Sequence, residues 1–155
     1  MMMMDNFKSV DEILDFAIEQ EQEAIDFYSE LADKATRADI KNIYLEFVKE
    51  EMGHKVKLLK VKEEKSLVEL PDSKVTDLKI SDYLVPVKAT PDMSYQDALV
   101  VVMNKEKAAY KLYTSLAKMA PTEETKTLFQ KLALEEANHK LQFETEYDDN
   151  IMKDN

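Results

Sequence analysis

Two Glu-x-x-His segments contain the only histidines of the sequence: Glu51 to His54, and Glu136 to His139. Residues three apart on an α-helix lie on one face, one turn apart, so the glutamate and histidine of each segment can reach one point. Carboxylate oxygens combined with imidazole nitrogens suit a first-row transition metal, and iron or manganese more than zinc where oxygen dominates. The two segments therefore predict a transition-metal site.

Four amphipathic helices are predicted to position these segments. Apolar residues recur at alternating spacings of three and four over 10–35 and 40–61, and again over 99–120 and 128–143. Ser9, with Glu12 three residues later, has the pattern of a capping box at the start of the first helix. Asp92 or Ser94 is expected to cap the third helix. This pattern indicates an all-α protein.

Six polar residues interrupt the apolar stripes, where a helical bundle would otherwise place leucine or isoleucine. An exposed ion pair on a solvated helix face is the simpler explanation of a Glu-x-x-His segment, but these segments lie on the apolar faces. Four buried glutamates would repel one another and take up protons unless cations matched their charge. We therefore predict a binuclear site with these six residues as ligands: Glu21, Glu51, His54, Glu106, Glu136 and His139.

The two halves of the chain repeat one another without a gap, at the offset that separates Glu21 from Glu106. Such a repeat predicts a helical hairpin that occurs twice and forms a bundle with internal two-fold symmetry. In that symmetric arrangement Glu51 and Glu136 are expected to bridge the two metals, while Glu21 and Glu106 bind one metal each. The pairs that keep the register include Tyr28 and Tyr113, Glu50 and Glu135, Glu51 and Glu136, and His54 and His139.

A long connection separates the two hairpins. We expect a single domain over residues 1–155, with hairpins at about 9–64 and 94–148 and the connection at about 65–93. Three of the four prolines fall near this connection, and the helical period is lost there. Thirty residues inside a small domain are unusual unless they cross from one end of the bundle to the other. The third helix should then begin at the same end as the second.

Composition excludes several classes of protein. The chain has no cysteine, so it can build neither a disulfide framework nor a thiolate-ligated iron centre. Its net charge of −11 argues against nucleic-acid binding, which needs lysine and arginine to neutralise phosphates. No apolar run is long enough to span a membrane, and the four N-terminal methionines are too few for a signal peptide. We expect a cytoplasmic protein.

The full set of motifs resembles the ferritin-like superfamily, and most closely the rubrerythrin-type di-iron carboxylate domains. The resemblance covers about residues 10–147 and rests on Glu-x-x-Ala-x-x-x-Tyr, present as Glu21-Ala24-Tyr28 and Glu106-Ala109-Tyr113, together with the two Glu-x-x-His segments. It implies an antiparallel four-helix bundle with a long crossover between helices 2 and 3. It also implies a homodimer and two iron ions per site, with manganese or zinc as possible substitutes. The implied chemistry uses peroxide or dioxygen.

Two departures from the family pattern affect its chemistry. The chain lacks the cysteines of the rubredoxin domain that many rubrerythrins carry, so electrons must come from an external donor protein such as a rubredoxin. Peroxide-reducing rubrerythrins have in common an additional carboxylate one turn beyond the helix 3 ligand. The residue at that position here is Ala109. Tyr28 and Tyr113 are expected to be core residues with satisfied hydroxyls, or else to orient a ligand carboxylate or relay a proton or an electron.

Three functional hypotheses follow. The first is a binuclear iron redox enzyme that reduces hydrogen peroxide or dioxygen in oxidative-stress defence. The second is a ferroxidase or iron-storage protein, which would require an iron load above two per chain. The third is a purely structural metal site.

Glu50 and Glu135, although repeated, are expected to be solvated, because adjacent helical positions point about 100° apart.

Overall fold

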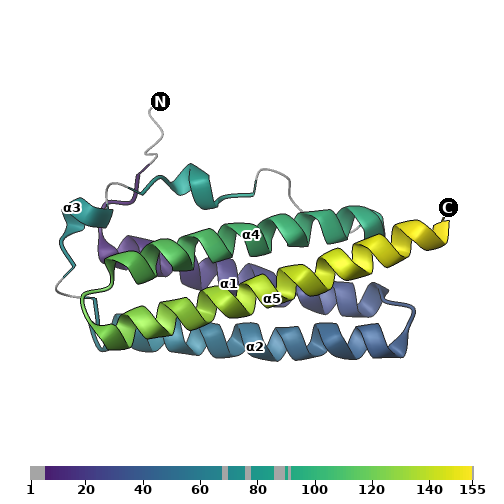
Figure 1. Ribbon diagram of the computed structural model, residues 1–155, viewed down its shortest axis with the longest axis horizontal. Helices are drawn as coiled ribbons and strands as arrows, with labels where there is room; N and C mark the ends of the chain where they lie inside the picture. The colour runs from purple at the N-terminus through teal and green to yellow at the C-terminus, as the bar shows by residue number, and fades with distance from the viewer. Residues whose placement is uncertain (1–5, 68–69, 76–77, 86–89, 91, 155) are drawn as a thin grey trace.

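The computed structural model describes residues 6–67, 70–75, 78–85, 90 and 92–154. The long elements of this part of the chain are all α-helices, and they form two antiparallel pairs in a four-helix bundle (Figure 1). This confirms the predicted all-α fold class and is consistent with a ferritin-like fold. The first pair is α1 (Val10–Lys34) with α2 (Ala38–Glu63), and the second is α4 (Tyr95–Met119) with α5 (Glu123–Asp154).

Side-chain hydroxyls fix the starts of three helices. At each start the hydroxyl accepts a hydrogen bond from a backbone N–H three residues later, which satisfies one of the free donors of the first turn. This confirms Ser9 as the first cap and selects Ser94 over Asp92 as the cap of α4. The three bonds are Glu12 N–H to Ser9 Oγ at 3.1 Å, Asp97 N–H to Ser94 Oγ at 3.0 Å, and Thr125 N–H to Thr122 Oγ1 at 3.1 Å.

The connection carries the chain back along the bundle, as predicted, so that α4 begins at the same end as α2 (Figure 1). Its described part contains two short helical turns, α3 (Asp72–Val75) and the 3₁₀ helix η1 (Ile80–Tyr83). The backbone N–H of Phe7 donates to Leu78 O at 3.2 Å, which ties the N-terminal segment to the crossover. The crossover is therefore held by backbone pairing as well as by apolar packing.

Two apolar clusters fill the interior, one toward each end of the bundle. The cluster at the α1 start includes Ile13, Leu58, Leu116 and Phe129. The cluster at the opposite end includes Tyr28, Tyr44, Leu99 and Phe143. On every long helix the predicted polar positions lie between residues of the two clusters, so the fold reserves a central layer for them.

The second hairpin extends further than the sequence pattern indicated, because α5 continues to Asp154 rather than ending near residue 148. An established helix adds one backbone hydrogen bond for each residue that it orders, so it can run beyond its apolar stripe.

None of the described helices combines the length and the apolar composition that a membrane span requires.

Candidate metal centre

The six residues predicted as ligands all lie in the central layer, and each is at most 2% exposed. Each of α1 and α4 contributes one glutamate, and each of α2 and α5 contributes a glutamate and a histidine from one helical turn. Carboxylates are rarely buried this completely unless they are paired or bind a metal. The layer contains Glu21, Glu51, His54, Glu106, Glu136 and His139.

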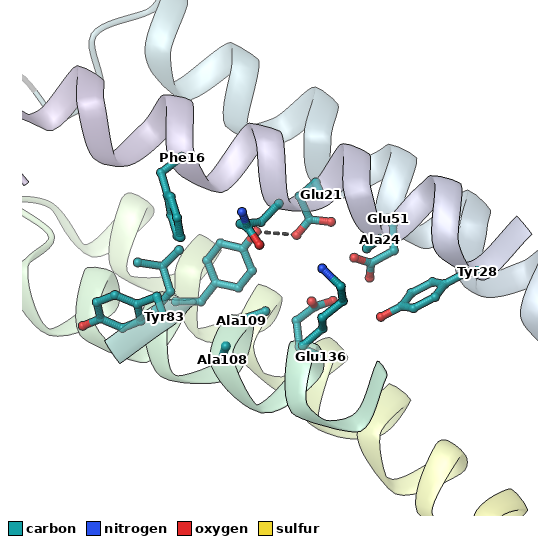
Figure 2. A pocket seen from close by; sticks show the side chains of 13 residues that line it. Phe16, Glu21, Ala24, Tyr28, Glu51, Tyr83, Ala108, Ala109 and Glu136 are labelled. Atoms are coloured by element: carbon teal, nitrogen blue, oxygen red, sulfur yellow. Dashed lines mark hydrogen bonds between the residues drawn. The ribbon is translucent and has the colours of Figure 1, made fainter. Parts of the chain in front are cut away.

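These side chains form two overlapping groups, and in each group four potential ligand atoms lie within 4.8 Å of one another. One group adds Glu21 and His54 to the shared pair Glu51 and Glu136, and the other adds Glu106 and His139 to that pair. Figure 2 shows the carboxylates of Glu21, Glu51 and Glu136 directed toward one another. The sharing of two glutamates is what their predicted bridging role requires, although that role stays a prediction.

The two histidines present Nδ1 to the glutamates in nearly equivalent ways. His54 Nδ1 lies 3.2 Å from Glu136 Oε1 and 3.5 Å from Glu51 Oε1. His139 Nδ1 lies 3.1 Å from Glu51 Oε1 and 3.6 Å from Glu136 Oε1. Each imidazole therefore lies closest to the glutamate of the opposite hairpin, and the internal repeat of the sequence becomes a two-fold arrangement of the site.

The donor atoms of this layer fit a pair of cations. Both carboxylate oxygens of Glu51 and of Glu106, and Nδ1 of both histidines, have no hydrogen-bond partner within the described part of the chain. The Nδ1–carboxylate contacts of 3.1 to 3.6 Å given above are close approaches and not hydrogen bonds. Buried polar atoms normally find a partner, so a cluster of unpartnered oxygens and nitrogens that converge indicates a bound cation.

The protonation of the metal-free layer supports the same conclusion. Burial, reinforced by the charge of Glu136 and Glu21, raises the pKa of Glu51 well above its ordinary value, and burial likewise raises the pKa of Glu106. Burial acts to lower the pKa of His54, but its contacts with Glu136 and Glu21 raise that pKa to about 10. Without a metal the layer therefore retains protons, and divalent cations would replace them.

The prediction that Glu50 and Glu135 are solvated was wrong for Glu135, which contacts the far side of the His54 imidazole, whereas the side chain of Glu50 is 42% exposed. Glu135 Oε1 lies at a hydrogen-bonding distance of 2.9 Å from His54 Nε2, and the side chain of Glu135 is only 25% exposed. Glu50 Oε2 lies 3.3 Å from His139 Nε2. Each glutamate points away from the ligands of its own helix, as the helical period requires, but toward the histidine of the other hairpin. The repeat of both residues in register was the available signal.

Replacing Glu135 by glutamine should weaken metal binding. A carboxylate on the distal nitrogen of a ligand histidine fixes the ring and raises its basicity, and the loss of such a partner typically costs about 10- to 100-fold in affinity. Glu50→Gln is the matched control and should cost less, because Glu50 is 42% exposed and its contact is longer. Competition titration with a chromophoric chelator measures both affinities. Equal affinities in both variants and in the wild type would contradict this role.

Tyr113 is both a core residue and a residue that orients a buried carboxylate, two roles that the sequence offered as alternatives. It is 1% exposed, packs against Phe129, and donates a hydrogen bond from its hydroxyl to Glu21 Oε1. Tyr28, its equivalent in the first half, is also buried and packs against Phe143. It makes no matching bond, because both oxygens of Glu106 lack a partner among the described residues. Tyr113 thus orients Glu21, and no hydroxyl among the described residues does the same for Glu106.

A small cavity adjoins the carboxylates on the side of α1 and α4 (Figure 2). Its volume is about 20 Å³, and its wall includes Glu21, Glu51, Glu136 and Tyr113. Ala109, which stands where related peroxide-reducing proteins are expected to have a further carboxylate, also lines it. A water molecule needs at least about 10–15 Å³ measured in this way, so the cavity admits a ligand of a few atoms.

Comparison with known proteins assigns the family. The sequence matches the family described as Rubrerythrin over residues 12–147, which is most of the chain. Searches of curated proteins and of solved structures returned no match. The family match includes most of each of the four long helices and all six residues of the buried layer, and no rubredoxin domain is detected in the 155 residues. The resemblance inferred from the motifs is confirmed: the chain belongs to the rubrerythrin family.

Proposed function

We propose that this protein is a di-iron oxidoreductase that reduces hydrogen peroxide or dioxygen with electrons from an external donor protein. The observation that carries the proposal is the sharing of Glu51 and Glu136 between two buried ligand groups, because two adjacent metals suit a two-electron reduction. When bound there, two ferrous ions would supply those electrons. Iron is favoured over zinc because carboxylate oxygens outnumber imidazole nitrogens and because zinc has no redox chemistry.

The residues of the chain hold and orient this centre. Glu21 and His54 would complete one metal position, and Glu106 and His139 the other. The Tyr113 hydroxyl restricts the rotamers of Glu21, so this carboxylate is oriented before metal binds. The two apolar clusters exclude bulk water from both ends of the layer, which strengthens electrostatic interactions within it.

The size of the adjoining cavity supports a small oxidant as the substrate. At about 20 Å³ it has room for peroxide or dioxygen but not for an organic molecule. Tyr113 and Glu21 lie in its wall and could exchange a proton with a bound ligand. Ala109 leaves open the space that a further carboxylate would fill.

Filling the cavity tests the proposal. Ala109→Leu should slow the oxidation of bound ferrous iron by peroxide about 10- to 100-fold, because an oxidant displaced from the metals loses its reactive geometry. Iron content should be unchanged, since Ala109 contributes no ligand atom. Stopped-flow absorbance measures the rate, and Ala109→Ser, which keeps a small side chain, is the control. Wild-type protein whose ferrous iron does not react with peroxide or dioxygen would overturn the redox proposal.

The remaining hypotheses predict different measurements. An iron-storage protein would accumulate more than two iron ions per chain in a large particle, which sedimentation with metal analysis detects. A purely structural site would bind metal but would not cycle between oxidation states.

We further propose a homodimer. Four apolar side chains on the outer face of α2 are 40–63% exposed, which favours a partner surface there: Leu45, Met52, Val56 and Leu59. Sedimentation velocity tests this association.

A further inference from the structure

A chain of aromatic rings leads from the metal layer toward the end of the bundle where α4 begins. The Phe47 ring stacks on the His139 imidazole with centroids 4.1 Å apart. Phe143 lies 5.3 Å from Phe47, and Tyr44 stacks on Phe143 at 5.4 Å. The Tyr95 ring follows at 6.5 Å from Tyr44. The rings thus form a continuous path from one predicted ligand to a pair of tyrosines.

At the end of this path, hydrogen bonds join the two tyrosines to a carboxylate. Tyr95 donates its hydroxyl proton to Glu146 Oε2 at 2.8 Å. A phenol has one proton, so in the hydrogen bond between Tyr44 and Tyr95 the donor must be Tyr44. Tyr44 is buried, whereas Tyr95 and Glu146 line a surface cavity of about 270 Å³. The series therefore links a buried phenol to a place that outside molecules can reach.

The internal repeat shows that packing alone does not require these polar groups. The equivalent positions at the other end of the bundle are all apolar, and three of them are completely buried. The fold can therefore fill these five equivalent positions without a hydroxyl or a carboxylate. The equivalents are Phe129 for Tyr44, Leu132 for Phe47, Leu58 for Phe143, Val10 for Tyr95 and Val61 for Glu146.

Tyrosine is the side chain of this protein best suited to lose a single electron, because the sequence contains neither tryptophan nor cysteine. A phenol that loses an electron becomes a strong acid, so the loss is easiest where a base accepts the proton. Glu146 is such a base for Tyr95. Burial raises the pKa of both Tyr44 and Tyr95, so both are neutral phenols before any oxidation.

We propose that Tyr44 and Tyr95 form a one-electron relay between the metal centre and the surface, a role that rests on the proposed redox function. Dioxygen takes four electrons and four protons on its way to two water molecules. Two bound ferrous ions would supply two of the electrons, the external reductant would supply the other two one at a time through the tyrosines, and solvent would supply the protons. A further electron leaves Tyr95 and passes through Tyr44 and the phenylalanines toward His139, while the Tyr95 proton moves to Glu146. An external one-electron reductant then returns the electron to the tyrosyl radical, and Glu146 returns the proton.

The cavity beside Tyr95 suits this last step. Its lining is polar and carries both charges, because Lys34 and Arg37 lie there with Glu146, and Arg37 is paired with Asp39 Oδ2 at 2.6 Å. A small polar reductant can therefore approach Tyr95 from this cavity.

Electron paramagnetic resonance tests the relay. Ferrous-loaded protein is mixed with dioxygen and frozen within milliseconds, and a tyrosyl signal is expected that narrows when the tyrosines are ring-deuterated. Tyr95→Phe and Tyr44→Phe keep the rings and should lose most of this signal, and Glu146→Gln should lower its yield. Tyr110→Phe is the matched control and should leave the signal unchanged, because Tyr110 is 43% exposed and lies outside the path.

Iron oxidation followed by absorbance in the same samples separates the two proposals. Iron that is oxidised without a tyrosyl signal overturns the relay and leaves the redox function standing, as does a signal that Tyr95→Phe and Tyr44→Phe leave unchanged. Iron that stays ferrous overturns the proposed function and the relay together. Equal iron content and circular dichroism in all variants confirm that the substitutions did not disturb the fold.

Discussion

Wild-type protein is expected to bind about two iron ions per chain, and the double variant His54→Ala, His139→Ala is expected to bind none. Each ligand group contains a single imidazole, so the double variant removes the only nitrogen ligand from both groups. The loss of a residue that merely supports a ligand costs about 10- to 100-fold in affinity, so the loss of a ligand itself should exceed about 100-fold. Metal analysis after anaerobic reconstitution and desalting measures the content.

Single substitutions make this prediction sharper, because the two groups share some residues and not others. His54→Ala alone should leave about one iron ion per chain, since only one group contains His54. Glu51→Ala should be as damaging as the double histidine variant, because Glu51 belongs to both groups. Glu46→Gln, an exposed glutamate on the same helix, is the control. Two iron ions in the double histidine variant would place the metal site elsewhere.

The metal-free protein should lose stability as the pH rises, and this is the second prediction with a large expected effect. Burial raises the pKa of Glu51 and of Glu106 above 4.5 in the folded state, so above that pH the folded state binds more protons than the unfolded state. Stability therefore falls with increasing pH. His54 acts in the same direction, because its pKa rises from 6.5 to about 10, and its contribution is lost over that interval. The pKa of Glu136 is lowered, because its contacts with His54 outweigh the effect of its burial. Glu136 therefore acts in the opposite direction, but only at acid pH.

Glu106→Gln should therefore have opposite effects on the two forms of the protein. It removes a buried carboxyl that must take up a proton to fold at pH 7, because burial raises its pKa well above 4.5, so it should stabilise the metal-free form by about 1–3 kcal/mol. It also removes a ligand, so it should reduce the stabilisation that metal provides, which for a ligand at 1,000 times its Kd is about 4 kcal/mol. Urea unfolding at pH 5, 7 and 9, with and without ferrous iron, measures both effects. A metal-free variant less stable than the metal-free wild type at every pH would contradict this account.

The sequence by itself was sufficient for the bundle and for the six residues of its buried layer. Helical periodicity fixes where each side chain points relative to its own helix, so Glu21 and His54 could be recognised as polar residues on apolar faces. The repeat at one constant offset added the symmetry, and with it the prediction that Glu51 and Glu136 occupy equivalent central positions. The caps at Ser9 and Ser94 could be predicted for a similar reason, because a cap depends on residues within one helical turn.

Only the tertiary structure decided which side chains of different helices meet. Glu135 points away from the ligands of its own helix, and only the packing of α5 against α2 brings it to His54. The bond from Tyr113 to Glu21 and the aromatic path from His139 to Tyr95 likewise join residues from different helices. Periodicity gives a direction about one axis, whereas such contacts depend on the distance and rotation between two axes. These depend on how the whole core packs, and no single stretch of sequence specifies them.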